Sequence, residues 1–249
     1  MNIFKNYATE DGLDPIEART HNMSSKYKQV NTAEAIGVFK DNGFEVMGTS
    51  AAKPRAEHRK GYQKHVVAFT RDDLVTGGGE QLQLLLTNSH DGTTSFRLDS
   101  GIFRFVCANG LVVGDTAHTT RIKHVGDCLN QIDKAIKYQL ERLPQVAAEI
   151  ERFKGIILGP DTVADFSMRS AELRIPEVKV LIPVRARRSA DLSNDLWTVY
   201  NRVQEILIRG GLRYMEKGGD FKTLRKISSI DTVSKVNKEL WNLAKSFAA

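Results

Sequence analysis

Apolar and polar side chains alternate along much of the first half of the chain, and this pattern predicts β-strands. Leu82, Leu84 and Leu86 recur at a period of two, which puts them on one face of an extended segment. Asp91-Gly92, between two such runs, is typical of a hairpin connection. Short links between consecutive strands indicate an antiparallel meander. The predicted strands cover residues 44–47, 66–69, 82–86, 95–98 and 102–106.

After Asp127 the apolar positions recur every three or four residues, which predicts amphipathic helices. Pro144 either kinks the first of these helices or opens the next one at its first turn. Residues 174–190 contain two prolines and are interpreted as a linking segment. Further helices are predicted for residues 162–173, for residues 194–209 and after Asp231.

One helix is also predicted before the first strand. Asn31 can cap its N-terminus, and Glu34 follows three residues later, as in a capping box. Asp41-Asn42-Gly43 supplies a stop, with glycine at the left-handed position.

The two patterns together predict an α+β fold, in which an N-terminal antiparallel β-meander packs with a mostly helical C-terminal half. The sheet-rich half is expected to cover residues 1–127 and the helical half residues 128–249. A chain of 249 residues is long enough for one large domain, and we expect the two halves to form one continuous domain.

Charge is distributed unevenly along the chain. Residues 1–127 hold 15 basic and 15 acidic side chains, whereas residues 128–249 hold 21 basic and 15 acidic ones, so the net charge of +6 belongs to the second half. A basic surface attracts polyanions by Coulomb attraction and counterion release. The charge pattern therefore makes nucleic acid a candidate partner.

The expected cellular location rests on two kinds of segment that we do not find in the sequence. No apolar stretch approaches the roughly 20 residues that a membrane-spanning helix needs, and the first 15 residues do not resemble a signal peptide. We therefore expect a cytoplasmic protein without a membrane partner. Cys107 and Cys128 are not arranged as a CxxC motif, and in a reducing cytoplasm they are expected to be free thiols.

The region from residue 88 to residue 113 brings many polar groups into a predicted sheet. A buried polar group without a partner is costly, so this density indicates either a structural network or an open site. We predict a structural network of Asn88, Arg104, Cys107 and Asn109. The sequence leaves open whether His90, Arg104, Cys107, Asn109 and His124 converge on a cleft or on a sealed core.

Basic side chains gather in three separate clusters, which suits a surface that follows a nucleic-acid backbone better than a small-ligand site. Solvated loops are the alternative interpretation. The predicted nucleic-acid-binding residues are Lys53, Arg55, Arg59, Lys60, Lys64, Arg185, Arg187, Arg188, Lys222, Arg225 and Lys226.

Arginines and aromatic residues of the predicted sheet supply a further option. Arg97 and Arg104 are expected on adjacent strands, where they would hold phosphates if they faced the same side. Phe96, Phe103 and Phe105 would then stack on bases, although a core role is favoured for the phenylalanines.

The candidate catalytic residues are His90, Asp91 and His124, which have the donor types of a metal site that activates water. Metal-ligand spacings such as HxH or HxxxH are absent, so His90 and Asp91 are more simply interpreted as capping a turn. No cofactor and no resident metal are predicted. Cys107 is interpreted as a small core residue rather than a nucleophile.

The chain resembles a family of phage- and plasmid-like proteins that carry a domain of unknown function common in prophages, conjugative plasmids and integrative elements. The resemblance covers most of the chain, and it departs from the family pattern at Ile206, where a polar Asn is expected. It rests on residues 25–27, 61–65, 88–92, 101–111, 122–124, 195–197, 201–205 and 209–211, with Asn237, Leu240 and Trp241. It implies a mobile-element origin, and so the cytoplasm of the host cell if a phage encodes the protein.

Our leading hypothesis is a non-enzymatic nucleic-acid-binding accessory protein of a phage or mobile element, acting on single strands or with recombination factors. One alternative is a protein-binding antagonist of a host defence system, with a host or phage protein as its partner. The other is a metal-dependent hydrolase or nuclease. A homo-oligomer is compatible with the leading hypothesis.

Overall fold

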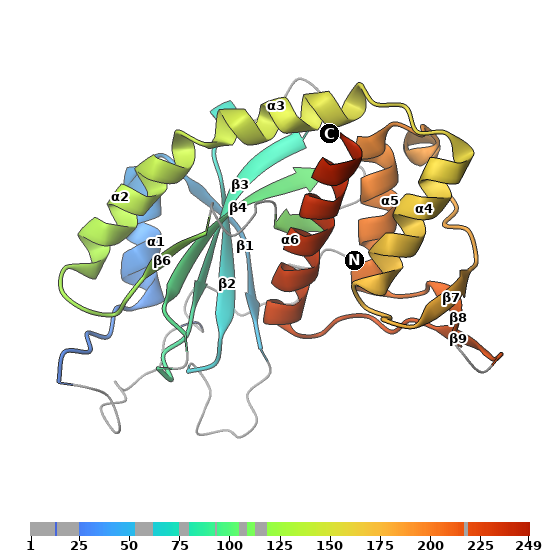
Figure 1. Cartoon of the computed structure of the whole chain (residues 1–249). Helices are drawn as coiled ribbons and strands as arrows, with labels where there is room; N and C mark the ends of the chain where they lie inside the picture. The colour runs from blue at the N-terminus through green and yellow to red at the C-terminus, as the bar shows by residue number, and fades with distance from the viewer. Residues whose placement is uncertain are drawn as a thin grey trace. The chain divides into compact units, whose positions relative to one another are not determined.

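The computed structural model describes residue 13 and residues 25–52, 62–74, 80–92, 94–104, 109–112, 119–216 and 219–249 (Figure 1). The chain divides into two compact units, Met1–Pro144 and Gln145–Ala249. The predicted α+β class is confirmed, because an antiparallel sheet forms in the first unit and helices dominate the second.

The sheet of the first unit is an antiparallel meander, as predicted. Its strands follow one another in the order β1-β2-β3-β4-β5, and β6 pairs with β4 beside this path. The strands are β1 (Glu45–Ala51), β2 (His65–Thr70), β3 (Glu80–Asn88), β4 (Phe96–Arg104), β5 (Asn109–Val112) and β6 (Thr120–Ile122), and a short 3-10 helix, η3 (Asp72–Leu74), follows β2.

One strand replaces two that the sequence predicted. Asp99, Ser100 and Gly101 continue β4 in register with β3 instead of forming a turn. The polar side chains are tolerated in this buried strand because each has a partner: Arg97 donates to Asp99, and Ser100 donates to Gln139 at 2.8 Å. Arg97 and Arg104 therefore lie on the same strand, and their predicted placement on adjacent strands is wrong.

Helices α1 (Thr32–Asp41) and α2 (Cys128–Leu140) pack side by side against the sheet (Figure 1). The capping box of Asn31 and Glu34 forms as predicted. Phe39 of α1 stacks on Phe69 of β2, with ring centroids 3.7 Å apart. All nine residues of β3 are buried, so the alternation of leucine and glutamine along it marks two covered faces and no solvent-facing side.

Pro144 opens a new helix, which selects the second of the two predicted alternatives. α2 ends at Leu140, and α3 (Leu143–Lys154) begins with this proline in its first turn. Proline is favoured there because the first amides of a helix have no intrahelical partner.

The second unit contains α3, α4 (Pro160–Glu172), α5 (Leu196–Arg209) and α6 (Ile230–Phe247). Trp197 and Tyr200 of α5 meet Trp241 of α6 edge to face, and Phe153 of α3 packs on the same indole. These aromatic rings form the centre of the helical core.

A small antiparallel sheet in the second unit was not predicted. It consists of β7 (Val178–Leu181), β8 (Arg213–Glu216) and β9 (Phe221–Thr223), in the order β7-β8-β9. Residues 174–190, interpreted as a linking segment, therefore include a strand, followed by the 3-10 helix η5 (Ser189–Asp191). The strands are too short for a period of two to stand out in the sequence.

Among the described residues, no helix combines the length and the apolar character needed to cross a membrane.

Candidate functional site

The polar residues predicted to form one network lie at opposite ends of the sheet. Asn88 ends β3 beside His65, whereas Arg104 ends β4 opposite Glu80 and Asn109. Nine residues of β4 separate the two ends, which is about 26 Å at the usual rise per residue. Asn88 therefore cannot share a network with Arg104 and Asn109, and Cys107 lies outside the described residues.

Asn88 instead joins a buried cluster around the hydroxyl of Thr32, at the start of α1. Its Nδ2 donates to Thr32 Oγ1 at 3.2 Å. Nε2 of His65 lies 2.8 Å and Nε2 of His90 lies 3.1 Å from the same oxygen. All four side chains are at most 1% exposed, so this cluster is a sealed structural network rather than an open site.

The contacts around Thr32 indicate which of the contacting ring nitrogens donate and which accept. The carbonyl oxygen of Gln63, 3.0 Å from Nδ1 of His65, can only accept, so this nitrogen carries the proton. Nε2 of neutral His65 then accepts from the Thr32 hydroxyl. Since Asn88 already donates to one lone pair of Thr32, Nε2 of His90 must donate to the other. This set of bonds requires a neutral His65, because its Nε2 must accept from the Thr32 hydroxyl.

His124 lies near this cluster but belongs to an aromatic stack. Its ring lies between Phe96, with centroids 4.5 Å apart, and Tyr27, with centroids 5.2 Å apart. Burial lowers the pKa of His124 below its ordinary value, and nearby His90 adds to the effect, while backbone groups of Lys28 and Thr94 oppose it.

The candidate metal ligands do not assemble. Among the described residues, no three His, Cys, Asp or Glu side chains are placed to hold a metal ion. Nε2 of His90 faces Thr32, and His124 is stacked between rings. The described residues therefore give no support to a catalytic metal centre at His90, Asp91 and His124. Asp91 acts electrostatically on Tyr27, whose raised pKa comes first from burial and then from this carboxylate.

The first predicted basic cluster is mostly beyond the structure's description. Lys53, Arg55, Arg59 and Lys60 fall outside the described residues. Lys64 precedes β2, and its carbonyl oxygen accepts from the amide of Ala52.

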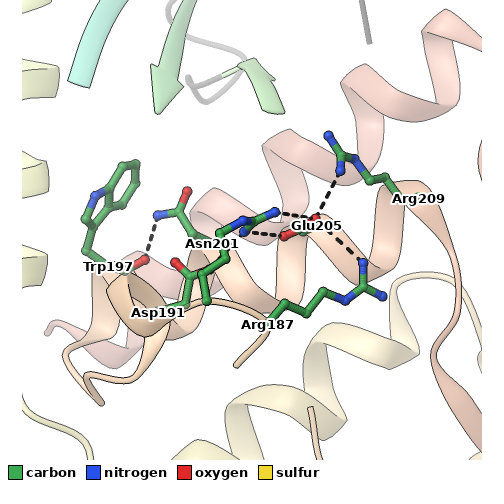
Figure 2. Close-up of polar contacts among 7 residues, drawn as sticks. Arg187, Asp191, Trp197, Asn201, Glu205 and Arg209 are labelled. Atoms are coloured by element: carbon green, nitrogen blue, oxygen red, sulfur yellow. Dashed lines mark hydrogen bonds and ion pairs between the residues drawn. The ribbon is translucent and has the colours of Figure 1, made fainter. Parts of the chain in front are cut away.

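In the second unit, a buried carboxylate gathers three arginines, as Figure 2 shows. Both oxygens of Glu205 accept from Arg188 at 2.9 Å, Arg209 donates to Glu205 at 3.1 Å, and Arg187 approaches it to 3.6 Å. Arg188 also donates to Asp191 at 2.9 Å. The bond to Glu205 is the main cause of the raised pKa of Arg188.

Helix α5 carries Asn201, Arg202, Gln204 and Glu205 on its polar face. This face bonds within the second unit. Asn201 donates to the carbonyl of Trp197 at 2.7 Å (Figure 2), and Gln204 donates to Asn237 of α6 at 3.2 Å. Ile206, where the family pattern was expected to carry Asn, uses its carbonyl to accept from Gly210 at the helix end.

Two predicted basic clusters meet at Gly210-Gly211, the turn after α5. A Cβ atom on Gly210 would lie 2.7 Å from backbone atoms of Arg225 and Lys226, and one on Gly211 would lie 3.5 Å from Nη2 of Arg187. The turn thus brings the Arg187 side chain and the backbone of residues 225–226 to one place. We call the resulting set the basic surface; it comprises Arg174, Arg187, Arg188, Arg209, Arg225 and Lys226.

The remaining predicted cations differ in their surroundings. Lys222 on β9 pairs with Glu216, which raises the pKa of the lysine. Arg185 is exposed. Neither has a described contact that joins it to the basic surface.

Sequence reasoning missed Glu205, Asp191, Arg174 and Arg209 as members of the site. The spacing of Glu205 and Arg209 by one helical turn was a usable signal for one pair. Asp191 and Arg174 gave none, because their partners come from other elements.

The chain belongs to the family described as "Domain of unknown function (DUF932)", whose model matches residues 20–241. Two Escherichia coli (strain K12) proteins, UPF0380 protein YfjQ and UPF0380 protein YafZ, are each 30% identical to it over 237 residues. These alignments cover 92% of this chain and 85% of each relative. No solved structure matches the chain.

Proposed function

We propose that the protein binds nucleic acid through the basic surface of its second unit and performs no chemistry on it. The observation that carries the proposal is the meeting of two sequence-distant basic clusters at Gly210-Gly211. An accessory role in a phage or mobile element, as the family resemblance implies, is part of the same proposal.

Charge balance supports this proposal. Glu205 and Asp191 partly neutralise the arginines that they contact. The basic surface nevertheless has six cations against these two carboxylates, so an excess of positive charge remains. Such an excess attracts a phosphate backbone without regard to its sequence.

The solvent exposure of several of these cations also supports the proposed nucleic-acid binding. Arg187, Arg225 and Lys226 are exposed, and half of the Arg187 side chain is open to solvent. The 3.6 Å separation of Arg187 from Glu205 is too long for a good hydrogen bond, so its guanidinium retains donors for a phosphate. Glu205, which is held by Arg188, lies beside Arg187.

The test is a titration of labelled single- and double-stranded oligonucleotides with the protein over a series of salt concentrations. We expect the variant with both Arg225→Gln and Lys226→Gln to bind about tenfold more weakly at low salt. Its slope of log affinity against log salt should fall by about 1.4, because each lost phosphate contact on a single strand contributes about 0.7.

A variant with Lys134→Gln and Lys137→Gln is the matched control, because it removes the same charge from exposed positions of α2 in the first unit. It should bind much as the unmodified protein does. The proposal fails if the unmodified protein binds no oligonucleotide at low salt, or if the control weakens binding as much as the test variant.

A further inference from the structure

An exposed aromatic ring stands on the outer face of the β8–β9 hairpin. The Phe221 side chain is 49% exposed, and the guanidinium carbon of Arg213 lies 5.6 Å from its ring centroid. The cation therefore lies over one face of the ring, a cation–π contact at an exposed site. Phe221 makes this contact from an edge strand whose three residues are all exposed.

Side chains alternate between the two faces of β8 and β9, and this places Phe221 and Glu216 on opposite faces. Met215 pairs with Phe221, and Arg213 pairs with Thr223, so these four residues share one face. Tyr214 and Lys222 pair on the opposite face, where Lys222 also meets Glu216. Tyr214 is buried, which identifies that opposite face as the inward one. The outer face therefore combines a ring and a cation without a carboxylate among its paired residues.

The hairpin leads directly into the basic surface. The amide of Leu224 donates to Leu212, and the amide of Gly211 donates to Leu224, both at 2.8 Å. These bonds continue the β8–β9 pairing as far as the Gly210-Gly211 turn. Met215, opposite Phe221, lies four positions after Gly211, which is about 13 Å at the rise of a strand. A polynucleotide held at the turn can thus reach the ring.

We propose that Phe221, with Arg213 beside it, is a base-stacking platform that makes the protein select single-stranded over double-stranded nucleic acid. This inference rests on the proposed function and names the form of its ligand. Stacking requires a base that is not already stacked and paired within a duplex, whereas phosphates are available in both forms. The basic surface supplies affinity for both, and the platform supplies the preference.

The test compares three labelled ligands of equal length: oligothymidine, a duplex, and an abasic strand that keeps the phosphates but has no bases. Phe221→Ala should weaken binding of oligothymidine by about tenfold, in the range measured for loss of one base–aromatic stack. It should leave binding of the duplex and the abasic strand unchanged. Phe221→Trp should restore or increase binding of oligothymidine.

Ile157→Ala is the matched control, because Ile157 is also an exposed apolar side chain of the second unit, at 72% exposure. Fluorescence of Trp197 and Trp241, both in the core of this unit, checks that each variant is folded. If oligothymidine binds but Phe221→Ala has no effect, the platform is refuted and the proposed function stands. If the unmodified protein binds none of the ligands, both proposals are overturned.

Discussion

Glu205 illustrates how one buried carboxylate can organise several cations. It is 4% exposed and contacts Arg187, Arg188 and Arg209. A buried charge is tolerated only when it is paired and hydrogen-bonded, and the two parallel bonds from Arg188 meet that condition. Removing the charge leaves three arginines with fewer partners, and two of them are themselves mostly buried.

We therefore expect Glu205→Gln to lower the free energy of unfolding by about 3 kcal/mol, the usual cost of breaking a buried ion pair. Urea denaturation followed by tryptophan fluorescence measures this change. Glu151→Gln, at an exposed pair with Lys154, is the control and should cost less than about 0.5 kcal/mol. Equal losses in the two variants would show that Glu205 contributes no more than a surface charge.

The lowered pKa of His124 predicts how the free energy of unfolding depends on pH. Its pKa is lowered in the folded protein, so the unfolded chain takes up a proton at a higher pH than the folded chain does. Its contribution to stability is fully present above about pH 6.5, the ordinary histidine pKa, and is lost as the pH falls through the lowered value. The loss from one such group reaches at most about 1.4 kcal/mol for each pH unit.

His124→Phe keeps an aromatic ring between Tyr27 and Phe96 and removes this titration. Denaturation followed by far-ultraviolet circular dichroism at a series of pH values should therefore show a shallower loss of stability below pH 6.5 than in the unmodified protein. An unchanged slope would mean that the acid sensitivity comes from groups other than His124.

The end of α5 shows how a single glycine positions an element. Gly210 has φ 80° and ψ −172°, a conformation that residues other than glycine rarely adopt. Its α-carbon faces the backbone of residues 224–226 so closely that no side chain fits between them. The helix end and the segment after β9 can approach only because residue 210 is glycine.

Gly210→Ala should accordingly destabilise the second unit by about 3 kcal/mol, since the new Cβ would lie 2.6 Å from the carbonyl oxygen of Leu224. Gly37→Ala is the control, because a Cβ at that position of α1 meets nothing within 4 Å. Alanine in a helix should leave stability unchanged or raise it by up to about 1 kcal/mol. Thermal unfolding of both variants measures these changes in stability. A Gly210→Ala variant as stable as the unmodified protein would refute the close approach at residue 210.

At the scale of the whole molecule, each compact unit has its own core and its own spectroscopic label. All six histidines belong to Met1–Pro144, and both tryptophans belong to Gln145–Ala249. Tryptophan fluorescence therefore reports on the second unit alone. Acid sensitivity that comes from histidine belongs to the first.

This division predicts that residues 143–249, which include all of α3, fold when produced alone. The ring contacts of Trp241 with Trp197, Tyr200 and Phe153 all lie within this segment. The fragment should show the same tryptophan emission maximum as the full chain and a cooperative urea transition. Emission typical of solvent-exposed tryptophan would show that the second unit needs the first in order to fold.

Much of the fold could be predicted because its signals are local. The capping box at Asn31, the first-turn proline at Pro144 and the glycine after α5 each act within a few residues, and the structure contains all three. The prediction of two strands on either side of residues 99–101 was wrong. Asp99 and Ser100 bond to Arg97, Thr119 and Gln139, and these partners come together only when the strands and α2 assemble.

The sequence by itself determined the class of fold, the order of most elements, the family and the excess of positive charge in the second half. Only the tertiary structure decided which charges are paired, since Arg188 meets Glu205 from another element, 17 residues away. It also separated Asn88 from Arg104 and brought Arg187 to the turn that residues 225–226 approach. The physical reason is range: helix and strand formation depend on neighbours along the chain, whereas burial and pairing depend on neighbours in space.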